Sequence, residues 1–324
     1  MAARREVDVE SLLRGERRSL ARAITLTESS REDHREQAQA LLDAALPHAG
    51  KSLRIGISGP PGAGKSTFIE SFGLQAIAAD RRVAVLAVDP TSPIGGGSIL
   101  GDKTRMEQLA RSPQAFIRPS PSQQAFGGVA EKTRECVLLC EAAGFDLILI
   151  ETVGVGQSEY EVSSMVDFFL ALIPPNAGDE LQGIKRGIME LLDAIVVNKA
   201  DEGNEQAAER TQAQYRSALR LLRAGSDREP QVLCCSALTG HGVDAVRSMI
   251  DDYEQAAKNS GALDRRRAEQ NSRWLQQLTR EEMQRQLRRR LGEDGLIEEL
   301  ESAVADGRIS PLRAIARIRE KLGT

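Results

Sequence analysis

The segment from Gly59 to Thr67 reads GPPGAGKST and constrains the fold of this chain more than any other stretch. It matches the phosphate-binding pattern G-x-x-x-x-G-K-[ST] without a mismatch. Such a loop binds phosphate where it leaves a buried strand and opens a helix, because backbone N–H groups and the positive end of the helix then converge on the anion. A mostly apolar run over 53–58 precedes it, and apolar residues at helical spacing over 67–79 follow it. The segment therefore predicts a nucleotide-binding loop rather than a glycine-rich turn without a ligand.

Each residue type in this loop suits one part of a nucleotide. We expect Lys65 to reach the terminal phosphates and the Ser66 hydroxyl to bind Mg²⁺. Glycines let the chain approach the anion closely. The residues predicted to hold the phosphates are Gly59, Gly62, Ala63, Gly64, Lys65, Ser66 and Thr67.

Short aliphatic runs alternate with helical stretches from residue 53 to about 249. Because these runs are apolar on both faces, they indicate parallel strands that are covered by helices on each side. We therefore predict an α/β fold, a P-loop NTPase whose mostly parallel sheet is flanked by helices. The further runs are 83–88, 147–150, 168–173, 194–197 and 232–235.

The chain is charged and helical in pattern on both sides of this region, which predicts helical extensions at both ends. We expect an N-terminal helical extension over 1–50, a nucleotide-binding domain over 51–250 and a C-terminal helical arm over 251–324. In the arm, Met283, Leu287 and Leu291 recur every four residues and predict one apolar stripe.

Composition narrows the class of protein. With 43 Lys and Arg against 47 Asp and Glu among 324 residues, the net charge of −4 argues against a nucleic-acid binder. No apolar run approaches the roughly 20 residues of a membrane span, and we expect no targeting signal. The four cysteines fall in apolar segments and predict buried thiols in a reducing, cytoplasmic setting. The three scattered histidines show no zinc or nickel spacing.

The sequence Asn198-Lys199-Ala200-Asp201 follows the run 194–197 and has the pattern N-K-x-D. The Asp201 carboxylate is able to accept two hydrogen bonds from the ring NH and exocyclic amine of guanine, whereas adenine offers no such pair. The Lys199 stem would lie along the base. The short loop formed by Ser236, Ala237 and Leu238 would contact the guanine oxygen. The predicted cofactor is therefore GTP or GDP.

Acidic residues near the ends of other runs predict the metal site. Glu151 and Gly154 form E-x-x-G, in which the acid is suited to hold Mg²⁺ and the glycine N–H to meet the γ-phosphate. Asp89 and Asp102 are further candidates, so that the predicted metal ligands are Ser66, Asp89, Asp102 and Glu151. A helix cap or turn former is the alternative for each of these three acids.

Hydrolysis by this site alone should be slow, because Val155 rather than glutamine follows Gly154. Gln157 either orients the attacking water or lies on the surface. The loops 95–105 and 175–185 are candidate switches, and Lys185 or Arg105 would add positive charge once a partner orders them. The predicted catalytic residues are Lys65, Glu151, Lys185 and Gln157.

Together with the phosphate loop, six further stretches closely resemble the MeaB/ArgK family of GTPases over roughly residues 15–300. Such joint matches are more specific than any single loop. The stretches are VLAVDP (85–90), GGSILGDKTRM (96–106), FIRPSPS (116–122), ETVGVGQSE (151–159), AGDELQGIK (177–185) and NKAD (198–201).

The resemblance implies a chaperone for an adenosylcobalamin-dependent acyl-CoA mutase, which gates cofactor loading, protects the mutase and hydrolyses GTP faster in its presence. It also implies a homodimer joined through the C-terminal arm and acids at Asp89, Asp102 and Glu151 around Mg²⁺. In the family, the loop that contains Lys185 is a third switch, which couples the nucleotide to the partner. The stretches 122–127 and 174–176 depart from the family pattern and leave the identity of the mutase open.

Three alternatives remain at this point. A GTPase that delivers nickel would need a His-rich tail or a Cys/His cluster, and the sequence has neither. A protein kinase would pass the γ-phosphate to a protein, although no second substrate site is evident. A scaffold with an inactive nucleotide site is the third.

Overall fold

The computed structural model describes residues 8–29, 31–88, 106–119, 128–152, 157–175, 186–222, 230–292 and 295–322. By their contacts, the residues form two compact units, Met1–Arg266 and Arg267–Thr324. The division into 1–50, 51–250 and 251–324 stays a prediction.

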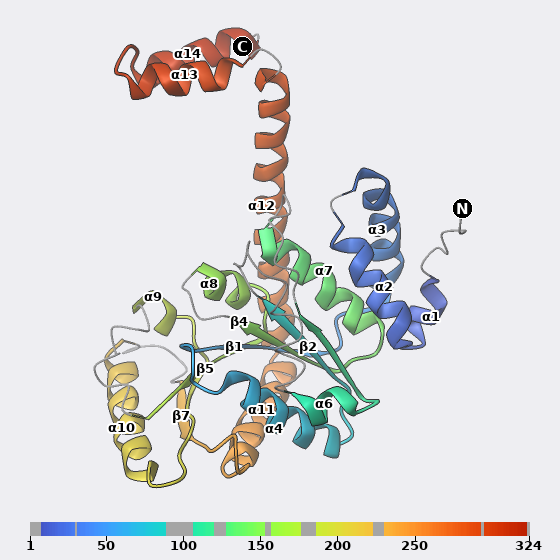
Figure 1. Ribbon diagram of the computed structural model, residues 1–324, viewed down its shortest axis with the longest axis vertical. Helices are drawn as coiled ribbons and strands as arrows, with labels where there is room; N and C mark the ends of the chain where they lie inside the picture. Colours follow the sequence, from blue (N-terminus) through green and yellow to red (C-terminus); the bar gives the residue numbers. More distant parts are fainter. Residues whose placement is uncertain are drawn as a thin grey trace. The chain divides into compact units, whose positions relative to one another are not determined.

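A seven-stranded sheet forms the centre of the first unit (Figure 1). Its order is β3-β2-β4-β1-β5-β6-β7, and every neighbouring pair is parallel. Because all strands run the same way, their carboxyl ends meet at one edge. The predicted α/β fold is confirmed. The strands are β1 Leu53–Ser58, β2 Val83–Val88, β3 Ala115–Pro119, β4 Leu147–Thr152, β5 Phe168–Ile173, β6 Ala194–Val197 and β7 Gln231–Cys234.

Two details of the sheet differ from the sequence prediction. Edge strand β3 was not predicted, because Arg118 and Pro119 interrupt its apolar run; an edge strand tolerates such residues. Glu151 was expected just after its strand, but β4 continues to Thr152 and pairs Glu151 with Ile57 and Ala87. The strand therefore fixes the backbone of Glu151 between β1 and β2.

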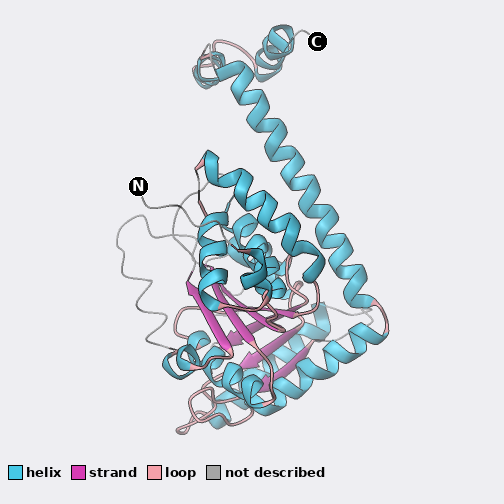
Figure 2. Cartoon of the chain, turned by 90° about the vertical axis from the view of Figure 1, so that its right-hand side faces the viewer, coloured by secondary structure: helices cyan, strands magenta, loops and turns pink. Residues whose placement is uncertain are grey.

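Helices cover both faces of the sheet (Figure 2). A hydrophobic core fills the space on each side. Helices α4, α6 and α11 contribute to one core, and α7 to α10 contribute to the other, where the N-terminal helices add a second layer over α7. The helices are α1 Val9–Leu13, α2 Arg17–Thr27, α3 Glu32–Ala45, η1 Leu46–His48, α4 Lys65–Ala78, α6 Glu107–Arg111, α7 Gly128–Ala142, α8 Gln157–Ser163, α9 Arg186–Met189, α10 Glu205–Leu222 and α11 Val243–Asn259.

The second unit contains most of α12 (Ala262–Gly292), followed by α13 (Leu296–Ala305) and α14 (Pro311–Leu322). The stripe predicted in this segment is uneven, since Leu291 is buried whereas Met283 is 68% exposed. None of the described helices is long and apolar enough to cross a membrane.

A buried ion pair joins the sheet to α7. The Arg54 guanidinium donates from Nε and Nη2 to the two carboxylate oxygens of Glu141, both at 2.9 Å. The backbone N–H of Gly50 donates to the same carboxylate at 2.9 Å. The side chain of Glu141 is only 1% exposed. Removal of one partner from such a pair leaves the other charge buried without compensation.

We therefore expect Glu141→Ala to lower the free energy of unfolding by about 3 kcal/mol, measured by urea denaturation. Glu107→Ala is the control, because Glu107 makes an exposed pair with Arg111. That change should cost about 0.5 kcal/mol or less. Equal losses in the two variants would contradict this interpretation of the buried pair.

Candidate functional site

The loop over 59–64 connects β1 to α4, and its glycines are required by shape. Gly59, Gly62 and Gly64 have φ values of 143°, 81° and 86°, which favour glycine. A Cβ on Gly59 would lie 2.1 Å from the carbonyl oxygen of Leu172, and one on Gly64 would lie 2.6 Å from Asn198 Nδ2. The glycines thus allow the loop to pack against β5 and the end of β6.

The first turn of α4 is suited to an anion. Its N-cap residue is Gly64, and no described side chain caps the helix. Gly62 and Thr67 are exposed, and a Cβ on Gly62 would meet nothing within 4 Å among the described residues. Backbone N–H groups at an uncapped helix start are favourable partners for phosphate. The loop therefore fits the phosphates of a nucleotide.

Lys65 is 9% exposed, and its ammonium lies against the loop. Nζ donates to the carbonyl oxygens of Gly59 at 2.7 Å and Pro60 at 3.2 Å. Burial lowers the pKa of Lys65, and the carboxylates of Glu151 and Glu159 act in the opposite direction. The cation is thus held by neutral carbonyl groups that a phosphate would replace with a stronger, charged partner.

The structure brings two of the predicted metal ligands together. Ser66 Oγ donates to Glu151 Oε1 at 3.2 Å, across the junction of α4 and β4. A hydroxyl and a carboxylate are oxygen donors of the kind that Mg²⁺ prefers. These two residues fit the predicted magnesium site, whereas Asp89 and Asp102 lie outside the described residues.

Asn198, at the end of β6, is 1% exposed and links two loops. Its Nδ2 donates to the carbonyl oxygen of Ala63 at 2.8 Å, and its Oδ1 accepts from the N–H of Ala237 at 2.9 Å. The Cys235 thiol also donates to Oδ1 at 3.6 Å, and burial raises the pKa of Cys235 to about 12, so the thiol stays protonated. Asn198 therefore fixes the phosphate loop relative to the loop after β7.

Asp201 is held next to that second loop. The hydroxyl of Ser236 donates to Asp201 Oδ2, and the N–H of Thr239 donates to Ser236 Oγ at 3.1 Å. No described residue is hydrogen bonded to Asp201 Oδ1. Lys199 is exposed, and its Cε lies 3.9 Å from the position of a Cβ on Gly64. An oriented carboxylate beside a lysine stem suits the edge and face of a guanine base.

The remaining predicted residues are less closely connected. Leu238 is 72% exposed, and Gln157 is the first residue of α8. Gly154 and Lys185 lie outside the described residues. Sequence reasoning did not select Glu159, which is 2% exposed. Its negative charge opposes the lowering of the Lys65 pKa by burial. Its three-residue spacing from apolar Val162 on α8 was the signal available for its inward orientation.

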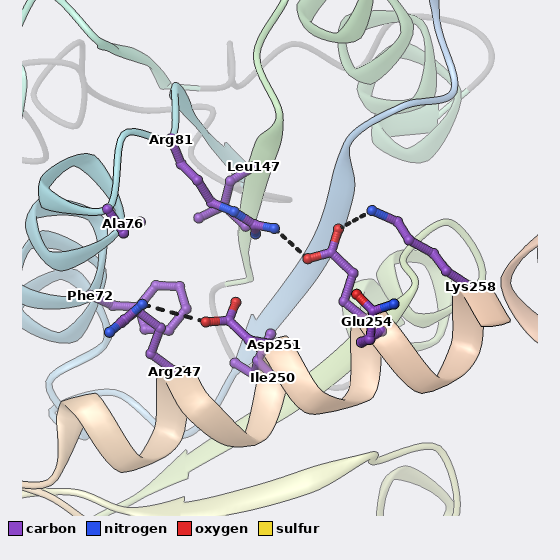
Figure 3. A pocket seen from close by; sticks show the side chains of 11 residues that line it. Phe72, Ala76, Arg81, Leu147, Arg247, Ile250, Asp251, Glu254 and Lys258 are labelled. Carbon is purple, nitrogen blue, oxygen red and sulfur yellow. Dashed lines mark hydrogen bonds and ion pairs between the residues drawn. The ribbon is translucent and has the colours of Figure 1, made fainter.

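A separate pocket of about 300 Å³ lies between α4 and α11, next to Leu147 at the amino end of β4 (Figure 3). Arg81 and Lys258 both pair with Glu254, and Arg247 pairs with Asp251 at 3.4 Å. These pairs compensate the charges in the pocket's wall. The pocket is at the edge of the sheet opposite to the carboxyl ends, where ligands of such sheets bind. Its lining residues are Phe72, Ala76, Ala79, Arg81, Leu147, Arg247, Ile250, Asp251, Glu254, Gln255 and Lys258.

The fold and the loops at its carboxyl edge define a P-loop GTPase. Residues 20–291 match the family model described as methylmalonyl Co-A mutase-associated GTPase MeaB. The chain therefore belongs to the MeaB family, and the resemblance found in the sequence is confirmed.

Similar proteins support this assignment. A putative GTPase of Caulobacter vibrioides is 51% identical over 322 residues, 98% of each chain. GTPase ArgK of Escherichia coli is 46% identical over 317 residues, 98% of this chain and 96% of that protein. A mouse protein named methylmalonic aciduria type A homolog, mitochondrial, is 46% identical over 314 residues, 94% of this chain and 76% of its own length. The crystal structure of an LAO/AO transport system kinase has a TM-score of 0.78 and 40% identity, covering 98% and 96% of the two chains.

The position of Asp201 gives a direct test of base recognition. An amide at this position would lose one acceptor for the guanine N–H groups and add a donor suited to the 2-oxo group of xanthine. We expect Asp201→Asn to weaken GTP binding about 100-fold or more and to improve XTP binding. Both affinities are measured by the fluorescence of labelled nucleotides. Glu202→Gln, which changes an exposed neighbouring acid, should bind like the wild type. Unchanged GTP affinity in Asp201→Asn would exclude Asp201 from base recognition.

Proposed function

We propose that this GTPase is a chaperone for an adenosylcobalamin-dependent acyl-CoA mutase, that it gates cofactor loading, and that it protects or reactivates the mutase. The family description and the name of the mouse relative support a mutase as the partner. The observation that carries the nucleotide part is the pair of Asn198 hydrogen bonds, which joins the phosphate loop to the loop beside Asp201. We further propose a cytoplasmic homodimer, joined through the C-terminal arm over 251–324.

In this proposal each residue has a distinct part in hydrolysis. Lys65 exchanges its carbonyl partners for the terminal phosphates of GTP. Ser66 and Glu151, with Asp89 and Asp102, hold Mg²⁺, which would neutralise phosphate charge. Gln157 would orient the attacking water only when its loop folds inward, and Gly154 N–H meets the γ-phosphate. The guanine base is held by two segments, the residues Asn198, Lys199 and Asp201 and the loop over 236–238.

Stimulation of GTP hydrolysis by the mutase follows from these residue roles. The chain has no glutamine directly after Gly154, so water is poorly oriented without help. Lys185 would add positive charge to the transition state when the mutase orders its loop. Hydrolysis would then be slow in the free protein and fast in the complex. Whether the protein holds GTP or GDP would therefore depend on the state of cofactor loading of the mutase.

A protein kinase is the second candidate, favoured by the likeness to a solved protein that is named a transport system kinase. Incubation with γ-³²P-GTP separates the two functions. Free phosphate is the product expected of the GTPase, whereas label retained on a protein would support the kinase. A metallochaperone for another metalloenzyme is a further alternative, which metal-dependent binding of such an enzyme would support.

The phosphate-loop lysine tests whether this site hydrolyses GTP. We expect Lys65→Ala to reduce GTP hydrolysis about 100-fold or more, because a transition-state cation is lost. A cooperative thermal unfolding transition of the variant shows that it is folded, so that the loss of hydrolysis is not caused by unfolding. Lys258→Ala, at the opposite edge of the sheet, should hydrolyse GTP normally. Wild-type turnover in Lys65→Ala would place hydrolysis elsewhere.

The partner is tested by measuring GTP hydrolysis with purified adenosylcobalamin-dependent acyl-CoA mutases, beginning with methylmalonyl-CoA mutase. The cognate mutase should raise the rate by at least about tenfold through ordered charge at the site. It should also bind differently to the GTP and GDP forms. The chaperone proposal fails if no such mutase changes the rate or binds in a nucleotide-dependent manner.

A further inference from the structure

The pocket between α4 and α11 has the size and the lining of a site for a small organic molecule (Figure 3). Its volume is about 300 Å³. The apolar part is formed by Phe72, Leu147 and Ile250, which also belong to the hydrophobic core. Pockets that bind small molecules have volumes of roughly 300–1,000 Å³ and combine apolar walls with a few polar groups. The polar groups of this pocket therefore indicate which ligand it fits.

Arg247, on α11, has hydrogen-bond donors left for a ligand. Among the described residues, its guanidinium makes one hydrogen bond, from Nη1 to Asp251 Oδ2 at 3.4 Å. The buried Nε has no acceptor in the part of the chain that the structure describes. The two side chains are 35% and 43% exposed, and such an exposed pair is weak. A guanidinium is a planar fork that matches a carboxylate with two parallel hydrogen bonds, so Arg247 is suited to bind an acidic group.

The charged residues of the lining leave one positive charge over. Arg81 and Lys258 both pair with the single carboxylate of Glu254, which lies between them in Figure 3. Glu254 is 6% exposed, so its charge is used by these two partners. Together with the pair of Arg247 and Asp251, the lining has three cations and two anions. A ligand with one negative charge would balance it.

We propose that this pocket binds a small organic carboxylate, with its acidic group on the Arg247 guanidinium and its apolar part against Phe72 and Ile250. A carboxylate carries the single negative charge that the lining lacks, whereas a phosphate monoester carries about −1.5 to −2 at neutral pH. The pocket is at the edge of the sheet opposite to the phosphate loop. This carboxylate site is therefore separate from the proposed GTP site and does not depend on it.

The test uses three probes that share a six-carbon chain: hexanoate, hexyl phosphate and hexanol. Their binding to the purified protein is measured by NMR, through saturation transfer to each probe during a titration. We expect hexanoate to bind with a dissociation constant of about 1 mM or lower. Hexanol should bind at least about tenfold more weakly, because it makes no charge-assisted hydrogen bond. Absence of hexanoate binding, or equal binding of hexanol, overturns the proposal. Tighter binding of hexyl phosphate than of hexanoate overturns it in favour of a phosphate site.

Substitutions locate the bound probe. Arg247→Gln should weaken hexanoate binding about tenfold or more. Arg247→Lys, which keeps the charge but loses the fork, should weaken it to a smaller extent and decides the question if the glutamine variant does not fold. The control is Arg285→Gln, because Arg285 makes a similar pair with Glu282 on another helix and is not part of the lining. That variant should bind hexanoate like the wild type.

Lys65→Ala separates this site from the phosphate loop and should also bind hexanoate like the wild type. Loss of binding in Lys65→Ala would overturn the proposal, because the probe would then occupy the phosphate loop. Wild-type affinity in folded Arg247→Gln protein would overturn it as well. None of these measurements requires GTP, so failure of the proposed function would leave their outcome unchanged.

Discussion

The side-chain amide of Asn198 is buried and hydrogen bonded on both of its polar ends. On one side it donates to the phosphate loop, and on the other it accepts from the loop that follows β7. A buried polar group left without its partner costs about 1–3 kcal/mol, so loss of either bond is expensive. This one amide sets the distance between the part of the site that suits phosphate and the part that suits a base.

The parallel sheet makes that link possible. β1 and β6 are separated only by β5, and both end at the same edge. The phosphate loop packs on β5 through Gly59, where any side chain would meet the carbonyl of Leu172. On the other side of β1, β4 carries Glu151 to the hydroxyl of Ser66. The neighbours of β1 thus determine which residues approach the phosphate loop, which separates the acidic side of the site from its base side.

Local patterns in the sequence predicted the features that depend on few residues. Apolar runs gave the exact bounds of β1, β2, β5 and β6, since strands buried on both faces leave a continuous apolar signal. The edge strand β3 was not predicted, because Pro119 is compatible with an edge strand but is atypical of a central one.

The connections within the site were harder to predict, because they depend on contacts between distant segments. Asn198 was predicted to hold the nucleotide, a role that stays a prediction, while its bonds to Ala63 and Ala237 join segments that are far apart in the chain. The burial of Glu159 likewise depends on how α8 packs against Gly56. The Asn198 contacts leave no trace in the local sequence, and the spacing of Glu159 from Val162 indicates only the helix face on which the acid lies.

The central claim is that the carboxyl edge of this sheet selects a guanine nucleotide. Calorimetric titration of the wild-type protein with GTP and with ATP, both in the presence of Mg²⁺, tests it most directly. The account predicts that GTP binds roughly a thousandfold or more tightly than ATP, because adenine leaves the Asp201 carboxylate without its two donors. Equal affinity for the two nucleotides, or binding of neither, would contradict it.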